Sequence, residues 1–293
     1  MSNDELTSAI VVTFHPRAKD LDGLAKICAQ VDLLVVVDNG STENELAQIR
    51  RAGQDWGFLL LENGENLGIA AALNLGVGEA QKVGCKWVGL FDQDSTVTEG
   101  FIETMIADFR RYREHKKIMQ IVPRYLDPET GIERPVSTFE DGGIFLTCTS
   151  GSLFSMEAFE RCGLFQENLF IYCVDDDYSL RIRKEGFFIG ESPNAVLLHR
   201  SGRPTFRKMF GKTIATKNYR PEVRYYYARN KVWILRFYAK TFPRIIVPTL
   251  REFVTIPLKI ALMEDESWRK IKLFIRGLAD GVSGRMGPLR EAG

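Results

Sequence analysis

Residues 33–41 read Leu-Leu-Val-Val-Val-Asp-Asn-Gly-Ser, an apolar and largely β-branched run that ends in polar, turn-forming residues. Such a run has the length of a buried strand, and its polar end is typical of the turn that follows one. Four more runs of this kind occur in the first half of the chain, at Ala9–Phe14, Phe58–Leu61, Trp87–Phe91 and Ile118–Val122. The pattern predicts a series of buried strands.

Helical patterns lie between these runs, at Leu21–Val31, Glu43–Ala52, Ile69–Val83 and Thr98–Glu114. Alternation of strands and helices predicts an α/β fold with a mostly parallel sheet that is covered on both faces. Further along the chain we expect strands at Ser150–Phe154, Phe187–Ile189 and Ala195–Leu198, and a helix at Tyr178–Glu185.

The composition is that of an ordinary globular protein. Of the 293 residues 45% are hydrophobic and 26% are charged, and the five cysteines form no C-x-x-C pair. No uncharged apolar run reaches about 18 residues, the length that a membrane-spanning helix needs. The N-terminus has acidic residues before its apolar stretch and no basic segment, so we expect no secretory signal.

The overall charge of +1 conceals a large asymmetry. Residues 1–199 carry 18 Lys and Arg against 31 Asp and Glu, a net charge of −13, whereas residues 200–293 carry 21 against 7, a net charge of +14. The acidic part would repel a polyanion unless a cation intervened, and the basic part would attract phosphate or an anionic lipid surface. The alternative is two solvated surfaces that differ without functional meaning.

Polar segments follow four of the predicted strands. They are residues 13–16, 38–41, 62–68 and 92–95. In an open α/β sheet, ligands bind beyond the carboxyl ends of the strands. Asp, Asn, Gly and Ser also form ordinary turns and helix caps, but four such segments together favour a site at this edge of the sheet.

Three groups of residues could carry chemistry. Asp92 and Asp94 leave one strand end together, in a pattern suited to Mg²⁺ or Mn²⁺, and helix capping is the structural alternative. Residues 175–177 are three consecutive aspartates, where repulsion raises the pKa of at least one carboxyl and an ionised one could act as a general base. Acidic residues also favour a helix N-terminus for structural reasons. His199 follows a predicted strand and could join a carboxylate on a metal ion.

Other catalytic motifs are missing. No G-x-G-x-x-G follows a strand and no G-x-S-x-G occurs, which argues against a dinucleotide-binding enzyme and a serine hydrolase. Gly211-Lys212-Thr213 looks like the end of a P-loop, but Phe206 stands where that motif needs its first glycine.

The chain resembles the family 2 glycosyltransferases, most closely their bacterial rhamnosyltransferase branch, over about residues 8–235. The motifs that carry the resemblance are residues 10–16, Asp38–Ser41, Asn66–Asn74, Phe91–Ser95, Phe170–Arg181, 199–202 and Arg224–Asn230. The chain has Tyr172, Val174 and Tyr178 where the family pattern often has Asp, Glu and Trp.

The resemblance implies a GT-A fold and an inverting transfer from a nucleotide sugar. It implies a catalytic domain at residues 1–235, with a nucleotide-binding part at about 1–117 and an acceptor part at about 118–235. We expect a basic, helical C-terminal extension at 236–293. The implied donor is dTDP-rhamnose, the cofactor is Mn²⁺ or Mg²⁺, and the acceptor is a saccharide, typically lipid-linked.

The resemblance also assigns roles to residues. Nucleotide binding falls to Thr13, His15, Asp38, Asn66 and Asp92, with Asp38 accepting from the pyrimidine base. Asp94 and His199 would bind the metal, and Asp175 would be the general base. The acceptor or a secondary site would involve Gly151, Asp177 and Arg181.

Two other functions stay open at this point. A nucleotidyltransferase would use a similar fold and release pyrophosphate, and an inactive relative would bind a nucleotide or carbohydrate without catalysis. We expect no nucleic-acid partner, because the consecutive tyrosines 225–227 would point in different directions on a helix.

The C-terminal extension has an apolar stretch at Phe237–Met263, broken by charges and by three prolines that we expect to interrupt any helix. It cannot comfortably span a bilayer. We expect a cytoplasmic enzyme whose extension binds the inner face of the plasma membrane peripherally. The alternative is that this stretch packs as ordinary core helices.

Overall fold

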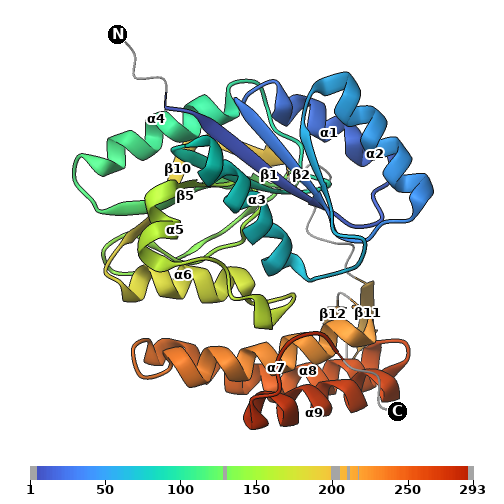
Figure 1. Cartoon of the computed structure of the whole chain (residues 1–293). Helices are drawn as coiled ribbons and strands as arrows, with labels where there is room; N and C mark the ends of the chain where they lie inside the picture. Colours follow the sequence, from blue (N-terminus) through green and yellow to red (C-terminus); the bar gives the residue numbers. More distant parts are fainter. Residues whose placement is uncertain (1–4, 128–130, 199–204, 210–211, 217, 290–293) are drawn as a thin grey trace. The chain divides into compact units, whose positions relative to one another are not determined.

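The computed structural model describes residues 5–127, 131–198, 205–209, 212–216 and 218–289. The chain forms two compact units (Figure 1). Unit 1 comprises Met1–Glu167 and Tyr178–Arg200, and unit 2 comprises Asn168–Asp177 and Ser201–Gly293. The boundary predicted at residue 235 concerns functional parts of the chain and stays a prediction.

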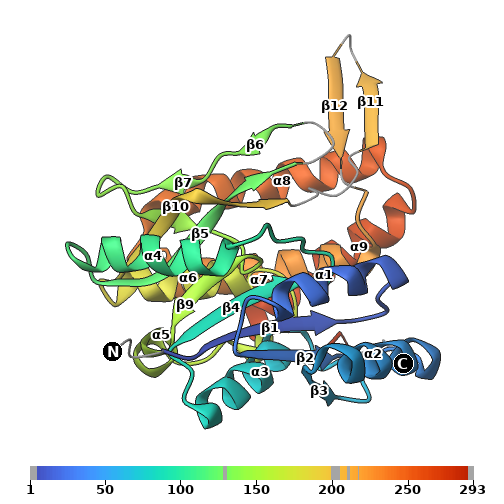
Figure 2. The same ribbon diagram turned by 90° about the horizontal axis from the view of Figure 1, so that it is seen from above.

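Unit 1 is built on one large sheet. Its strands are β1 (Thr7–Thr13), β2 (Leu33–Asp38), β3 (Leu59–Glu62), β4 (Trp87–Asp92), β5 (Ile118–Leu126), β6 (Glu133–Arg134), β9 (Ser152–Ser155) and β10 (Phe188–Leu198). The order is β10-β5-β9-β4-β1-β2-β3, and β6 pairs with β5 (Figure 2). All pairs along this order are parallel except those made by β9, so the predicted mostly parallel sheet is confirmed. A separate small pair is formed by β7 (Ser137–Thr138) and β8 (Ile144–Leu146).

Helices cover both faces of this sheet, as the alternation predicts. Figure 1 shows α1 (Ala18–Cys28), α2 (Glu43–Trp56) and α4 (Phe101–Arg113) on one face, and α3 (Ile69–Val83) and α5 (Met156–Cys162) on the other. Every residue of β1 is buried, because side chains on both sides of the strand meet a helix layer. The core beneath α4 contains Phe101, Met105 and Phe109.

The elements between residues 167 and 198 differ from the prediction. Helix α6 (Val174–Lys184) begins four residues before the predicted Tyr178, so the three aspartates form its first turn instead of preceding it. Acidic side chains stabilise this position because they face the positive end of the helix dipole. The two strands predicted at 187–189 and 195–198 are one strand, β10, whose register shifts between Glu191 and Val196. The short 3₁₀ helix η1 (Glu167–Leu169) precedes α6.

Unit 2 consists mainly of α7 (Pro221–Tyr238), α8 (Ile246–Met263) and α9 (Ser267–Ser283), with the 3₁₀ turn η2 (Pro243–Ile245). Strands β11 (Thr205–Met209) and β12 (Lys212–Thr216) form a hairpin (Figure 2). A buried ionic cluster joins the elements: Arg224 of α7 and Lys270 of α9 both contact the carboxylate of Glu264, which also accepts from the Thr216 hydroxyl. A buried carboxylate needs such partners, because an unpaired buried charge is costly.

The expectation that prolines interrupt every helix between residues 237 and 263 is wrong. Helix α8 runs through both Pro248 and Pro257. Pro248 lies in the first turn, where a missing N–H costs nothing, and Pro257 removes a single hydrogen bond that packing on the neighbouring turns can offset. Within the described residues, no helix has both the length and the apolar character needed to cross a membrane.

Close contact between α3 and β1 gives a stability prediction. A Cβ atom added at Gly76 would lie 2.4 Å from Cγ2 of Ile10, whereas one added at Gly78 of the same helix would meet open space. We expect Gly76→Ala to lower the free energy of unfolding by about 1–3 kcal/mol through overpacking. Gly78→Ala should raise it by up to about 1 kcal/mol, because alanine favours helix. Urea unfolding measures both, and equal shifts for the pair would contradict the contact.

Candidate active site

The carboxyl ends of three neighbouring strands meet at one edge of unit 1. Thr13 ends β1, Asp38 ends β2 and Asp92 ends β4, and the strand register places Thr13 beside Asp38 and Val12 beside Asp92. The predicted convergence of polar segments at this edge is therefore present. Its chemistry depends on how each of these side chains is held.

Asp38 is fully buried and lies at the centre of the β2–α2 turn. One carboxylate oxygen accepts from the hydroxyls of Thr13 (3.0 Å) and Ser41 (2.5 Å). The other accepts from the backbone N–H groups of Gly40 (3.1 Å) and Ser41 (2.9 Å). These four donors occupy the lone-pair sites that a carboxylate offers. The predicted bond from a pyrimidine N3–H stays a prediction and requires one of these donors to be displaced.

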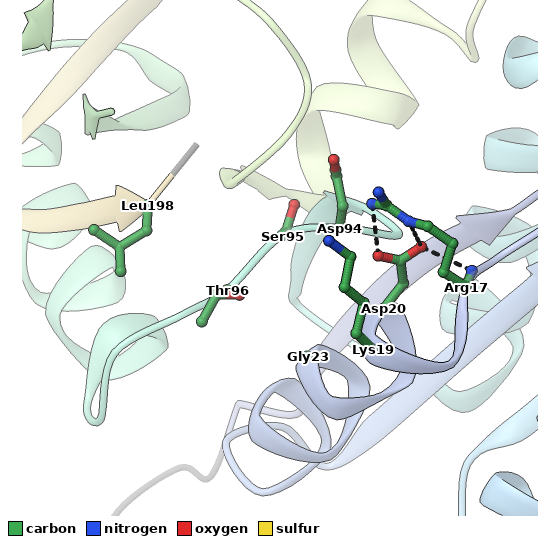
Figure 3. A pocket seen from close by; sticks show the side chains of 8 residues that line it. All are labelled: Arg17, Lys19, Asp20, Gly23, Asp94, Ser95, Thr96 and Leu198. Carbon is green, nitrogen blue, oxygen red and sulfur yellow. Dashed lines mark hydrogen bonds and ion pairs between the residues drawn. The ribbon is translucent and has the colours of Figure 1, made fainter. Parts of the chain in front are cut away.

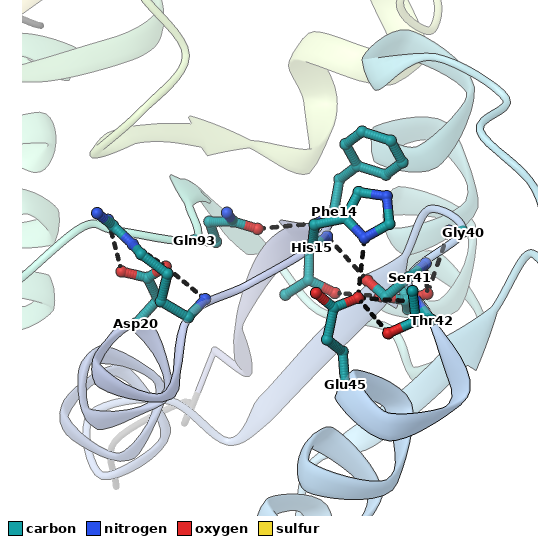
Figure 4. Close-up of polar contacts among 11 residues, drawn as sticks. Phe14, His15, Asp20, Gly40, Ser41, Thr42, Glu45 and Gln93 are labelled. Atoms are coloured by element: carbon teal, nitrogen blue, oxygen red, sulfur yellow. Dashed lines mark hydrogen bonds and ion pairs between the residues drawn. The ribbon is translucent and has the colours of Figure 1, made fainter.

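Two exposed aromatic side chains, Phe14 and His15, follow β1 with ring centroids 4.3 Å apart (Figure 4). His15 has a left-handed backbone, with φ of 50°. Its N–H donates to the Ser41 hydroxyl at 3.0 Å, and its Nδ1 lies 2.8 Å from a carboxylate oxygen of Glu45. The hydrogen bonds from His15 and from Thr42 at the start of α2 lower the pKa of Glu45 to about 2. The network fixes two aromatic faces that could stack on a base.

An asparagine network joins the β2 turn to the start of α3. Asn39 donates from Nδ2 to Oδ1 of Asn66 at 3.0 Å and accepts from Nδ2 of Asn63 at 3.1 Å. The backbone N–H groups of Leu67 and Gly68 bond to Asn39 and Asn66 respectively. Asn66, predicted to bind nucleotide, is exposed and orders the loop that opens α3.

The turn after β4 presents its two acids to solvent. Asp92 and Asp94 are both exposed, while Gln93 between them accepts from the Phe14 N–H at 2.8 Å. The buried Ser95 hydroxyl lies 2.8 Å from that of Ser150, which also accepts from the Asp92 N–H. The turn is thus fixed from beneath, and its carboxylates point outward.

A cavity of about 250 Å³ opens beside this turn. Its lining residues are Arg17, Lys19, Asp20, Gly23, Asp94, Ser95, Thr96 and Leu198. Figure 3 shows the side chains of Arg17 and Lys19 extending from the start of α1 toward the turn that carries Asp94. Arg17 forms a two-pronged pair with Asp20, at 2.9 and 3.0 Å. Lys19, the Arg17–Asp20 pair and the outward carboxylate of Asp94 in one cavity suit a phosphate group that carries a divalent cation.

The predicted metal ligands are only partly described. Asp94 forms no hydrogen bond or ion pair with the described part of the chain and is free to bind a cation. His199 lies outside the described residues, although Leu198 before it lines the cavity and bridges to Thr96. No cluster of three or more His, Cys, Asp or Glu side chains suited to a metal occurs among the described residues. Asp94 and Asp92 fit Mg²⁺ or Mn²⁺, which keep few protein ligands and complete their shell with water and phosphate oxygens.

In unit 2, the three aspartates of α6 have different environments. Asp176 pairs with Lys231 of α7 at 3.0 Å. Asp177 is buried and accepts from the Tyr238 hydroxyl at 2.8 Å and the Trp233 indole at 3.3 Å. Asp175 accepts the Asp176 N–H at 3.0 Å, and no side chain in the described part of the chain donates to it. Of the three carboxylates, that of Asp175 is the one available to a proton donor from solution.

Burial, followed by the charge of Asp176, raises the pKa of Asp175 to about 7. Lys231 acts in the opposite direction on this pKa. Burial alone would lower the pKa of Lys231, but the Asp176 carboxylate, with smaller contributions from Cys173 and Tyr227, keeps it above its ordinary value. A carboxyl with a pKa near neutrality is suited to accept a proton from a hydroxyl in a transition state.

The loop before Asp175 is strained and is held by α7. Phe170, Tyr172 and Cys173 all have left-handed backbones, with φ of 65°, 64° and 57°. Such conformations cost energy and persist only where neighbours enforce them. Here Nδ2 of the buried Asn230 lies 2.7–2.9 Å from the carbonyl oxygens of Leu169, Ile171 and Tyr172. Asn230 therefore sets the path of the chain into the first turn of α6.

The neighbouring Arg229 holds the same loop and is also fully buried. Its guanidinium donates to the carbonyl oxygens of Leu169, at 2.8 Å, and Gly287. The sequence contained a signal for both residues, since Arg224–Asn230 carries part of the family resemblance. It did not show that their partners would be backbone carbonyls 60 residues away along the chain.

Two predicted acceptor residues have structural contacts in unit 1. The Arg181 guanidinium donates to the carbonyls of Cys162 and Leu164 at 3.0 and 2.6 Å. Gly151 is buried at the start of β9, where a Cβ atom would lie 2.8 Å from Leu197 and 3.0 Å from Pro123. Their roles toward an acceptor stay predictions, as does that of Asp177.

Residues 8–162, more than half of the chain, match the sequence model of the family described as glycosyl transferase family 2. The chain belongs to this family. As a family 2 glycosyltransferase it is 27% identical to the dTDP-rhamnosyl transferase RfbF of Shigella flexneri, over 95% of this chain and 96% of RfbF. This similarity agrees with the rhamnosyltransferase branch indicated by the sequence motifs.

Solved structures share the fold of this glycosyltransferase. S. aureus TarS, in complex with UDP-GlcNAc, is 17% identical and superimposes with a TM-score of 0.60 over 95% of this chain and 81% of TarS. Mannosyltransferase PcManGT from Pyrobaculum calidifontis, in complex with GDP-Man and Mn²⁺, is 16% identical, with a TM-score of 0.54 over 98% of this chain and 77% of PcManGT. The predicted GT-A fold is confirmed.

The Asp38 turn gives a prediction. Asp38→Ala leaves four donors without an acceptor, one of them the buried Thr13 hydroxyl, so we expect the free energy of unfolding to fall by about 2 kcal/mol. We also expect weaker binding of a pyrimidine nucleoside diphosphate, because the turn carries Ser41, which holds His15. Asp38→Asn is the matched control: its amide can still bond both hydroxyls and both N–H groups, so it should lose less stability. Calorimetric titration and urea unfolding measure the pair, and unchanged nucleotide affinity in Asp38→Ala would move base binding elsewhere.

Proposed function

We propose that this glycosyltransferase moves L-rhamnose from dTDP-rhamnose, with inversion at the sugar carbon, to a hydroxyl group of a lipid-linked saccharide in bacterial surface-polysaccharide synthesis. One observation carries the choice of donor: the similarity to the dTDP-rhamnosyl transferase RfbF covers nearly the whole of both chains. The solved relatives bound to UDP-GlcNAc or GDP-Man support a nucleotide-sugar donor in general.

In this proposal the donor nucleotide binds at the edge of unit 1 where β1, β2 and β4 end. Phe14 and His15 stack on the thymine, and Arg17 and Lys19 neutralise phosphate charge in the cavity. Asp94, with Asp92 and His199, holds Mn²⁺ or Mg²⁺. When bound, the cation compensates the charge of the departing diphosphate. The Mn²⁺ in PcManGT supports a divalent metal on this fold.

In this proposal Asp175 is the general base that accepts the proton of the acceptor hydroxyl. As the acceptor oxygen bonds to the sugar carbon and the bond to the diphosphate breaks, the hydroxyl proton passes to the Asp175 carboxylate. Attack opposite the leaving group inverts the configuration, as in other inverting reactions at sugar carbons. The pKa of about 7 leaves Asp175 partly ionised near neutral pH and basic enough to accept the proton.

The donor assignment is tested by incubating the protein and an extracted lipid-linked acceptor with dTDP-rhamnose, UDP-GlcNAc or GDP-mannose. We expect dTDP to be released from dTDP-rhamnose and no nucleoside diphosphate to be released from the other two donors, as measured by ion-exchange chromatography. Release of pyrophosphate would indicate a nucleotidyl transfer. Faster turnover of UDP-GlcNAc or GDP-mannose than of dTDP-rhamnose would make the rhamnose assignment wrong.

The metal assignment predicts that Asp94→Ala abolishes turnover and removes the enhancement of dTDP binding by Mn²⁺, without a change in unfolding. Asp22→Ala, at an exposed acid of α1, is the control and should behave as the unchanged protein. Full activity in excess EDTA would rule out the metal role.

The base assignment predicts that Asp175→Asn lowers kcat by at least about 10²-fold with little change in donor KM. Asp177→Asn should retain more activity, since Asp177 is bonded to Trp233 and Tyr238. A raised folded-state pKa also means that ionising Asp175 costs stability as pH rises from 3.8 to about 7. Asp175→Asn should therefore raise the urea midpoint above pH 7 and leave it unchanged near pH 3, a readout independent of activity.

The same assignment predicts an acidic limb near pH 7 in the pH profile of kcat. Lys231→Met removes a positive charge that lowers the pKa of Asp175, so this limb should move to higher pH. Lys240→Met, at an exposed lysine of unit 2, is the matched control and should leave the limb in place. A limb that stays fixed in Lys231→Met would assign the titration to another group.

A further inference from the structure

Helix α8 presents an apolar stripe to solvent along its whole length. Its members are Val247, Leu250, Val254, Leu258 and Leu262, each between 51% and 74% exposed. They are spaced by three or four residues, which places them on one side of a helix. Single exposed apolar side chains are common on protein surfaces, but a continuous stripe indicates a contact surface.

The opposite side of α8 already has its packing partners within unit 2. Thr249, Ile260 and Met263 are buried there, and the ring of Phe253 lies 6.4 Å from that of Phe274 in α9. Figure 1 shows α8 running beside α7 and α9. The predicted alternative, packing as core helices, thus accounts for one face of α8 and leaves the stripe unexplained.

The exposed charges within α8 are basic, whereas the exposed Asp265 and Glu266 follow its end and contact Asn218 and Arg269. Arg244 precedes α8, and Arg251 and Lys259 lie within it, all three exposed. The single acidic residue of α8, Glu252, is half-buried and accepts from the Tyr227 hydroxyl at 2.6 Å. An apolar helix face that is edged by cations, with no exposed acid within the helix, is complementary to an anionic lipid surface.

We propose that this stripe is a membrane-docking face, with the five apolar side chains entering the headgroup region and Arg244, Arg251 and Lys259 meeting anionic phosphates. A second copy of the chain is a less favourable occupant, because pairing two such faces brings together the cations of two helices that carry no exposed acid of their own. Docking in the plane of the interface agrees with α8 being too charged to span a bilayer.

The docking face would bring the enzyme to the lipid-linked acceptor, a purpose that rests on the proposed function. Binding itself does not depend on catalysis. It is measured without donor or acceptor, so failure to dock and failure to transfer rhamnose are separate results.

The test is co-sedimentation with sucrose-loaded vesicles of phosphatidylcholine, with and without phosphatidylglycerol. We expect binding to the anionic vesicles at low salt, weaker binding in high salt and little binding to phosphatidylcholine alone. Val254→Gln combined with Leu258→Gln should lower the vesicle–water partition coefficient at least about tenfold, because two apolar side chains no longer enter the headgroup region. Arg251→Gln should weaken it about fivefold, and only at low salt.

Val83→Gln, at an exposed apolar position of α3, is the matched control and should bind as the unchanged protein. All substituted positions are exposed, so circular dichroism should show unaltered folding. The proposal is overturned if the unchanged protein does not bind anionic vesicles, or if the double substitution does not weaken binding. It is equally overturned if light scattering shows a stable dimer that the double substitution dissociates, since the stripe would then join two copies.

Discussion

The edge of unit 1 that is proposed to bind the nucleotide depends on one buried carboxylate that must be fully hydrogen-bonded. Asp38 ends β2 in the interior, where an unpartnered charge would be prohibitive, and its four donors come from the end of β1 and from the β2–α2 turn. Meeting this requirement fixes Ser41, which holds the N–H of His15, and His15 in turn engages Glu45 at the start of α2. A single buried charge thus sets the positions of the side chains that face solvent.

In unit 2 the groups that must be hydrogen-bonded are backbone carbonyls and not a side-chain carboxylate. The loop before α6 contains three residues in left-handed conformations, and the carbonyl groups of Leu169, Ile171 and Tyr172 in and beside it need donors. Asn230 and Arg229 supply those donors from adjacent positions of α7. The next residue, Lys231, binds Asp176. Three consecutive side chains of α7 therefore determine both the path of the loop and the electrostatic environment of Asp175.

Much of unit 1 could be predicted from the sequence, because its signals are local. The range predicted for α3 is the observed one, and the strand ends at Thr13, Asp38 and Asp92 meet where the rule for parallel sheets puts them. Predictions failed where local patterns compete with tertiary packing. The aspartates predicted to precede a helix form its first turn, as the alternative of a helix N-terminus allowed, and Pro257 lies inside α8 because the helix packs on its neighbours. The roles of Asn230 and Lys231 depend on contacts more than 50 residues apart, which periodicity does not reveal.

The bond from Arg229 to the carbonyl of Gly287 has a consequence for synthesis of the protein. The loop that carries Asp175 receives part of its support from a residue more than 100 positions later in the chain. During translation, unit 1 has most of its strands and helices available early, while this loop lacks its last partner until residue 287 has left the ribosome. The group proposed to accept the proton would therefore be among the last parts of the molecule to reach its working geometry, and a nascent chain would fold the proposed nucleotide-binding edge of unit 1 well before it could catalyse transfer.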